Sequence, residues 1–291
     1  MEKMLSEYAI AAEDSSPIVI GGVGGSGTRL IARILRDQGT SLPGELNEAL
    51  DNLWFSLLFV RRTILLKSHE ETQRLAWLFT NAMRRVLPIP RELVHMLDEA
   101  ARHDRGPALT RSVLQQARES MLAGRTTSDA SISWAWKQPN SHVIVPMLNR
   151  CFPRMKYIYV ARNGLDMAFS GNQNQLKYFW GDLLLEGDTS SSPRNALKYW
   201  VASYKRILGD QVMLGGRLYI LNFDSLCSNP AEQINRLNQF LGLDVSEDKL
   251  RTIAQSISPP GSIGRYQRLD CAQLDSVDIE FVRDMGFKVE I

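Results

Sequence analysis

The chain has 291 residues, of which 44% are hydrophobic and 23% charged, and its formal net charge is +2. These values are typical of a globular protein with a sizeable core, and they exclude binding of a polyanion through overall charge. We find no apolar run long enough to span a bilayer and no secretory signal before Asp14, so we expect a cytoplasmic protein without a transmembrane segment. The three cysteines are too few and too widely spaced for a metal cluster or a disulfide framework, and we expect no metal site.

The first predicted unit is a strand, a glycine loop and a helix. Residues 17–22 (PIVIGG) have the β-branched composition of a short buried strand, and an amphipathic helix opens at Ser26 and Thr28 and ends at Gly39. Residues from about 47 to 125 are rich in Leu and Arg and predict helices. We interpret them as a helical insert in a single domain spanning residues 1–291, with a core at about 17–45 and 130–268.

The second half of the chain alternates strands and helices. Strands are predicted at 134–137, 156–161 and 218–223, and helices at about 141–151, from 163, at 193–208 and at 230–241, with a polar loop or lid between 171 and 192. This order predicts a three-layer, P-loop-like α/β fold with a central parallel sheet flanked by helices. Ligands of such sheets bind outside the carboxyl ends of the strands, so we expect the chemistry in the loops that follow them.

The loop after the first strand, GGVGGSGTR, is the most informative segment. Glycines allow several backbone N–H groups to point at one spot, where the start of the next helix adds its positive dipole end. A nucleotide-triphosphatase loop of this spacing would have Lys at position 28 and Ser or Thr at 29, but this chain has Thr28 and Arg29. The loop therefore suits a phosphate-like group held without a metal ion, bound by Gly24, Gly25, Ser26, Gly27, Thr28 and Arg29.

The same loop resembles the 5′-phosphosulfate-binding loop of sulfotransferases that use 3′-phosphoadenosine-5′-phosphosulfate (PAPS), especially the tyrosylprotein and heparan-sulfate branches. A second segment, from Arg162 to Ser170, resembles the family's 3′-phosphate motif, an arginine after an apolar strand and a serine eight positions later. Both side chains can reach one dianionic phosphate, the arginine through its bidentate fork.

Three further segments carry the resemblance. Residues 136–139 (WKQP) resemble the family's W-K-x-P element, and residues 222–243 resemble its strand–Asp–helix segment. The loop with Gly264 and Arg265 resembles the late glycine-basic loop that closes on the 3′-phosphate. The helical insert has no counterpart, and acceptor recognition usually varies there. One departure is Gly25, where family members commonly have Lys or Arg, so a cation must come from Arg29 or Lys137.

The resemblance implies a donor, a product and catalytic roles. The donor is PAPS and the product 3′-phosphoadenosine 5′-phosphate (PAP), with no metal required. Lys137 resembles the lysine that supplies positive charge to the transferred group. A glutamate after the first helix is the base in both branches, and we prefer Glu48 slightly over Glu45.

Other interpretations stay open. A small-molecule or nucleotide kinase with a degenerate P-loop could use Asp224 as a metal-holding acid, and a non-catalytic nucleotide-binding module is a second alternative. The acceptor, a hydroxyl or amine of a carbohydrate, lipid, small alcohol or peptide tyrosine, is not determined, nor is the oligomeric state. The pairs Arg61-Arg62 and Arg84-Arg85 are too short to predict nucleic-acid binding.

Overall fold

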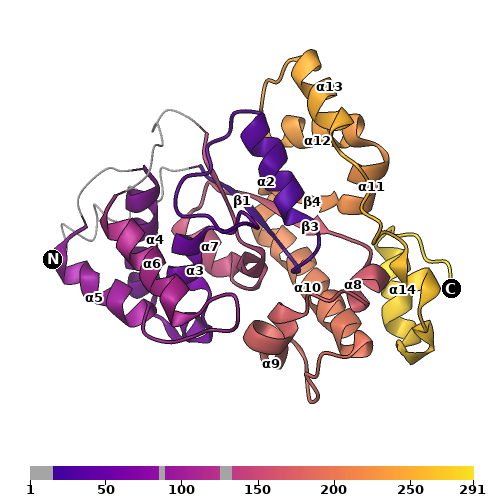
Figure 1. Ribbon diagram of the computed structural model, residues 1–291, viewed down its shortest axis with the longest axis horizontal. Helices are drawn as coiled ribbons and strands as arrows, with labels where there is room; N and C mark the ends of the chain where they lie inside the picture. Colours follow the sequence, from indigo (N-terminus) through magenta and orange to yellow (C-terminus); the bar gives the residue numbers. More distant parts are fainter. Residues whose placement is uncertain (1–15, 85–88, 125–132) are drawn as a thin grey trace.

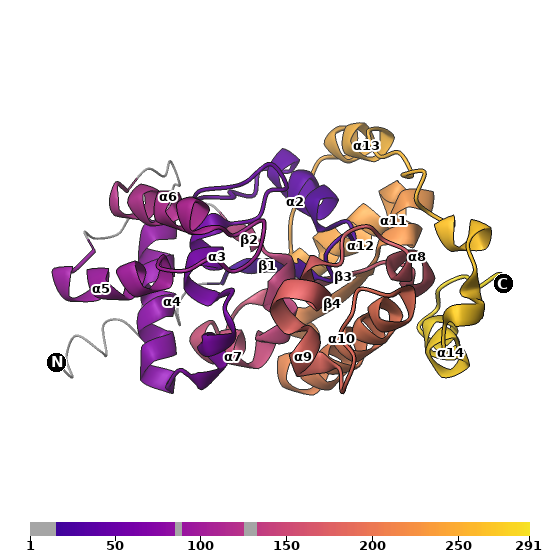
Figure 2. The same cartoon turned by 60° about the horizontal axis from the view of Figure 1, so that its bottom comes forward.

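A computed structural model describes residues 16–84, 89–124 and 133–291. Within these ranges four parallel strands form one sheet in the order β2-β1-β3-β4, of which Figure 1 labels β1, β3 and β4 and Figure 2 labels β2 as well. The strands are β1 (Ile18–Gly22), β2 (Ala135–Lys137), β3 (Lys156–Ala161) and β4 (Leu218–Asn222). Because all four run the same way, their carboxyl ends lie at one edge of the sheet, where the following loops meet.

Helices surround this sheet. Those before β2 are α2 (Thr28–Asp37), α3 (Leu53–Phe59), η1 (Arg62–Leu66), α4 (His69–Arg84), α5 (Arg91–Ala100) and α6 (Arg111–Leu122). Those between β2 and β4 are η2 (Pro139–Val143), α7 (Val145–Cys151), α8 (Gly164–Ala168), η3 (Gln175–Trp180), α9 (Gly181–Leu184), α10 (Pro193–Leu214) and η4 (Gly215–Arg217). Those after β4 are α11 (Phe223–Ser228), α12 (Pro230–Leu241), α13 (Glu247–Gln255), η5 (Arg265–Arg268), η6 (Cys271–Gln273) and α14 (Ser276–Asp284).

The two faces of the sheet have separate apolar cores. Alternate side chains of a strand point to opposite faces, so Ile158 joins the cluster formed with α2 and α12, while Tyr159 points toward α10. The ring of Tyr159 lies 5.8 Å from that of Tyr204 in α10. Figure 2 shows α2 and α12 on one side of the strands and α10 on the other. This arrangement confirms the predicted three-layer α/β fold.

The helices α3 to α6 pack beside the β2 edge of the sheet, at the left of Figure 1. Phe55 of α3 stacks on Trp136 of β2, with ring centroids 5.7 Å apart, and both side chains are buried. One apolar cluster therefore continues from these helices into the sheet. This packing brings the segment before α3 and the loop before α6 to the carboxyl end of β2.

Two segments differ from the sequence-based expectation. Residues 171–192, predicted as a loop, contain the π-helix η3 and the short helix α9, because Leu176, Phe179 and Trp180 are buried anchors within a polar stretch. The helix α10 continues six residues past Leu208 to Leu214, with Gly209 inside it, since one glycine costs a helix only about 1 kcal/mol. None of the described helices is long and apolar enough to cross a membrane.

Candidate active site

The loop between β1 and α2 has a backbone that only glycines adopt readily. Gly25 and Gly27 have φ angles of 94° and 101°. A Cβ atom on Gly27 would lie 2.1 Å from the ring of Phe223, so no larger residue fits there. The start of α2 follows this loop, and because the first N–H groups of a helix lack the usual helical partners, the loop has the character of an anion site.

A side chain from η3 holds the same loop. Gln175 accepts a hydrogen bond from the N–H of Gly24 (3.0 Å) and donates one to the carbonyl of Gly22 (3.3 Å). Gln175 is buried, and it lies 151 residues from Gly24 in the sequence. Sequence reasoning did not single out this residue, because a glutamine in a polar stretch gives no sign of such a distant partner.

A cavity of about 510 Å³ lies in front of the loop. It brings together most of the residues predicted from the two phosphate motifs and the strand ends, namely Gly24, Gly25, Gly27, Thr28, Arg29, Lys137 and Arg162. Ser26 is buried instead, and its hydroxyl turns back under the loop toward Gly22. With Arg33, four cationic residues thus line one cavity next to a helix N-terminus, an arrangement that attracts a polyanion.

Arg162 follows β3 and lines this cavity. Its guanidinium lies over the ring of Phe223, 5.4 Å from the centroid, and donates to the hydroxyl of Ser262 (2.8 Å). Burial lowers the pKa of Arg162, the nearby Asp166 carboxylate raises it, and the positive charge of Arg265 lowers it further. An anion bound between the two arginines would relieve their repulsion.

The late loop is fixed to α8. Asp166 of α8 accepts hydrogen bonds from the N–H groups of Gly264 (2.8 Å) and Tyr266 (3.3 Å). Arg265 donates to the carbonyls of Ser262 (3.2 Å) and Phe169 (3.4 Å). The loop predicted to close on a phosphate therefore lies beside Arg162.

Ser170 lies next to Gly25 of the glycine loop. Its hydroxyl accepts a hydrogen bond from the N–H of Asn172 (3.2 Å), and a Cβ atom on Gly25 would lie 3.3 Å from it. The structure therefore places Ser170 against the glycine loop.

Lys137 ends β2 and is only 3% exposed. Its ammonium donates to a carboxylate oxygen of Asp51 and to the carbonyl of Ala49 (3.0 Å). Burial lowers the pKa of Lys137, while the charge of Asp51 raises it. Asp51 is held in a tight turn, where its N–H donates to the side chain of Asn47 (2.8 Å) and Leu50 has a φ angle of 62°. Such a left-handed non-glycine residue is a strained feature that often marks functional sites.

The two glutamates proposed as base lie elsewhere. Glu48 is exposed, and the carboxylate of Glu45 accepts a hydrogen bond from Gln116 of α6 (3.4 Å). Neither lines the cavity beside the glycine loop, whereas Asp51 does. Sequence reasoning stopped at Glu48 because Asp51 forms no motif with its neighbours, and only folding brings it to Lys137.

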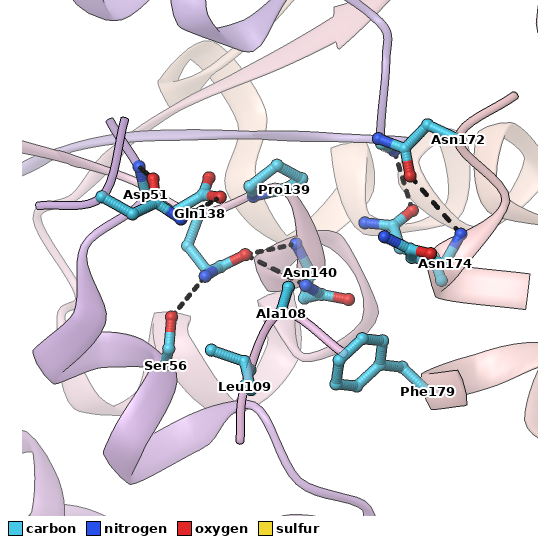
Figure 3. Close-up of a pocket in the computed structure, with 13 residues that line it drawn as sticks. Asp51, Ser56, Ala108, Leu109, Gln138, Pro139, Asn140, Asn172, Asn174 and Phe179 are labelled. Carbon is cyan, nitrogen blue, oxygen red and sulfur yellow. Dashed lines mark hydrogen bonds between the residues drawn. The ribbon is translucent and has the colours of Figure 1, made fainter. Parts of the chain in front are cut away.

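A second cavity, of about 90 Å³, adjoins the first and shares Gly24, Asp51, Pro139 and Asn172 with it. Figure 3 shows its lining. Gln138 donates to the hydroxyl of Ser56 (2.6 Å) and accepts from the side-chain amide of Asn140 (3.0 Å). Asp51 thus lines both cavities, so it lies next to a ligand bound in either one.

A profile of the sulfotransferase family matches residues 17–247. The chain belongs to the sulfotransferase family. The sequence resemblance is thereby confirmed, and the glycine loop, Lys137 and Arg162 all fall within the matched range. A search of curated proteins gives no match.

Two solved sulfotransferase domains share this fold, and a third sulfotransferase structure is similar at a lower score. The sulfotransferase domain from the curacin biosynthetic pathway is 16% identical with a TM-score of 0.52, the match covering 95% of this chain and 99% of that one. The sulfotransferase domain from the Synechococcus PCC 7002 olefin synthase is 16% identical with a TM-score of 0.50, covering 96% and 98%. The sulfotransferase STF9 from Mycobacterium avium is 15% identical with a TM-score of 0.48, covering 100% and 82%.

Asp224, the acid that a kinase could use, has a structural partner in this sulfotransferase. Its carboxylate accepts a hydrogen bond from the N–H of Asn163 (2.8 Å), and burial raises its pKa. It lines another cavity, of about 420 Å³, and not the one beside the glycine loop. The carboxylate that lines the glycine-loop cavity comes from Asp51.

Proposed function

We propose that this sulfotransferase takes the sulfuryl group from PAPS, without a metal ion, and transfers it to a hydroxyl or amine of its acceptor, releasing PAP. The observation that carries this proposal is the buried Nε of Arg162, which has no hydrogen-bond partner among the described residues. A buried donor of this kind is costly unless a ligand accepts from it. Arg162 and the glycine loop both line the 510 Å³ cavity.

The two phosphate-bearing ends of PAPS fit these two places. The 5′-phosphosulfate would bind at the start of α2, held by the loop from Gly24 to Thr28 and by Arg29. The 3′-phosphate would bind Arg162 and Arg265, with Gly264 and Ser170 beside them. Arginine suits a dianionic phosphate because its fork donates two parallel hydrogen bonds.

Transfer is an in-line displacement at sulfur. A bond forms between the acceptor oxygen and sulfur, the bond between sulfur and the bridging oxygen of PAPS breaks, and PAP leaves with the electron pair. Lys137 supplies positive charge to the oxygen that becomes negative. We propose Asp51 as the base that takes the acceptor proton, in preference to Glu48 or Glu45, because it lines both cavities and contacts Lys137.

Calorimetric titration of PAP, AMP and ATP tests the proposal, each with EDTA and with Mg²⁺. We expect PAP to bind without metal and more tightly than AMP or ATP. Equal affinity for PAP and AMP would remove the 3′-phosphate site. A Mg²⁺-dependent preference for ATP would support the kinase alternative, and PAP binding with no transfer from labelled PAPS would support a non-catalytic module.

A further inference from the structure

The 90 Å³ cavity beside Asp51 has an unusual lining. Its volume is well below the 300–1,000 Å³ of sites for drug-sized ligands, so it admits one small group rather than a whole large acceptor. Leu109 and Phe179 supply apolar surface, and Asp51 supplies the charged group of the lining. The polar surface otherwise comes mainly from side-chain amides, those of Asn47, Gln138, Asn140, Asn172, Asn174 and Gln175.

Hydrogen bonds hold several of these amides in place. The carbonyl oxygen of Asn140 accepts from the indole N–H of Trp180 (2.8 Å), and its NH₂ group donates to Gln138 (3.0 Å). Asn172 accepts from the N–H of Asn174 (3.4 Å), as Figure 3 shows. An amide offers both donors and an acceptor with lone pairs to spare, and a hydroxyl needs both. A fixed set of amides can therefore both donate to and accept from a hydroxyl group.

The positive charges near this cavity are engaged elsewhere. Lys137 is bound to Asp51, and Arg29 and Arg162 line the neighbouring donor cavity. Arg105 lies behind the wall, where it donates to the carbonyls of Ser56 and Val60, and burial lowers its pKa to about 9. Among the described residues, this lining contains the carboxylate of Asp51 and no Lys or Arg side chain, so an anionic acceptor has no cation in it to pair with.

We propose, on the basis of the proposed function, that the acceptor is an uncharged polyol or sugar whose reactive hydroxyl enters this amide-lined cavity beside Asp51. Because Lys137 is already paired with Asp51, an acidic sugar or an acidic peptide finds no free cation in this lining and brings an unpaired negative charge into it. An ammonium group pairs with the Asp51 carboxylate, which then cannot accept the proton of the reacting group. A tyrosine ring needs a larger slot than this cavity of about 90 Å³ offers.

The test is an acceptor panel with labelled PAPS, using neutral polyols and methyl glycosides, the matched uronic acids and amino sugars, and a tyrosine peptide. We expect kcat/KM for the neutral members to exceed that of their charged counterparts by at least tenfold. PAP binding is measured on the same samples. Two outcomes overturn this inference alone, provided that PAP binds. In the first, a charged acceptor or the peptide is used as well as the neutral members or better; in the second, no neutral acceptor is sulfated. Failure of PAP to bind overturns the proposed function.

A pair of variants at Asn174 tests the charge argument directly. Asn174 is exposed at the rim of the cavity, so the substitution leaves the core intact. Asn174→Lys adds a cation beside the cavity. We expect the ratio of kcat/KM for the neutral glycoside to kcat/KM for the uronic acid to fall about fivefold, because one added charge near a protein surface changes binding on this scale. Asn174→Gln is the matched control and should keep the wild-type preference. An unchanged preference in Asn174→Lys contradicts the inference.

Discussion

Lys137 donates from its buried ammonium to the carboxylate of Asp51, a residue 86 positions earlier in the chain, where the two cavities meet. The pair places a cation and a carboxylate side by side at the carboxyl end of β2. Asp51 also lies in a strained turn that contains Leu50, so its position is built into the backbone.

Asp51→Asn is expected to reduce turnover about a hundredfold or more while PAP affinity changes little. The base acts on the acceptor proton and not on the nucleotide. Single-turnover transfer from labelled PAPS, with PAP titration beside it, measures both effects. Glu48→Gln and Glu45→Gln are the matched controls and should stay active. If either glutamate variant is inactive while Asp51→Asn turns over normally, the base is that glutamate.

Lys137→Met is expected to reduce turnover roughly a hundredfold, which is the usual effect of removing one preorganised group that stabilises developing charge. Charge builds on the bridging oxygen as the S–O bond breaks, so the lysine acts mainly in the transition state. The variant also leaves Asp51 without its partner, and removing one member of a buried pair costs about 3–5 kcal/mol. Urea unfolding of Lys137→Met and Asp51→Asn measures the loss of stability and so separates it from the effect on catalysis. Normal turnover in folded Lys137→Met would exclude the role.

Arg162→Ala is expected to weaken PAP binding by about 1.5–3 kcal/mol, the worth of hydrogen bonds to a charged group. AMP lacks the 3′-phosphate, so its affinity should hardly change. Calorimetry with both nucleotides gives the comparison, and Arg194→Ala, at an exposed pair with Asp275, is the control for a surface arginine. Equal losses for PAP and AMP would mean that Arg162 supports the fold and does not bind the phosphate.

Gly25→Ala is expected to cost about 1–2 kcal/mol of unfolding free energy and to weaken PAP binding. Its φ angle of 94° strains an alanine, and the new Cβ atom meets the hydroxyl of Ser170. Gly39→Ala is a matched control, since Gly39 has a φ of 103° but no atom within 4 Å of an added Cβ. It should lose similar stability and keep PAP affinity. A loss of PAP affinity in both variants would contradict a specific role for Gly25.

His142 is expected to make the protein sensitive to acid. Burial lowers its pKa to about 4, and it contacts the carbonyl of Pro139 (2.8 Å) and the hydroxyl of Ser203 (3.3 Å). The unfolded chain takes up a proton near pH 6.5, which the folded chain resists, so stability falls as the pH drops from 6.5 toward 4. The loss at pH 5 relative to pH 7 is about 2 kcal/mol.

Urea unfolding of His142→Gln at pH 7 and pH 5 measures this contribution, because the variant lacks the titrating group. Its stability should change less between the two pH values than that of the wild type. The exposed His69 provides a control variant, His69→Gln. If both variants keep the full pH dependence of the wild type, His142 is not its cause.

The amino-acid sequence by itself predicted the fold class and most of the candidate residues that line the glycine-loop cavity. Strand and helix periodicity, the glycine loop and the strand-end residues Lys137 and Arg162 are local patterns, and a parallel sheet brings strand ends together. Tertiary structure alone decided that Asp51 meets Lys137, that Gln175 holds Gly24, and that an amide-lined cavity lies beside them. These contacts join residues 86 and 151 positions apart, and packing between distant segments leaves no periodic signal in either one.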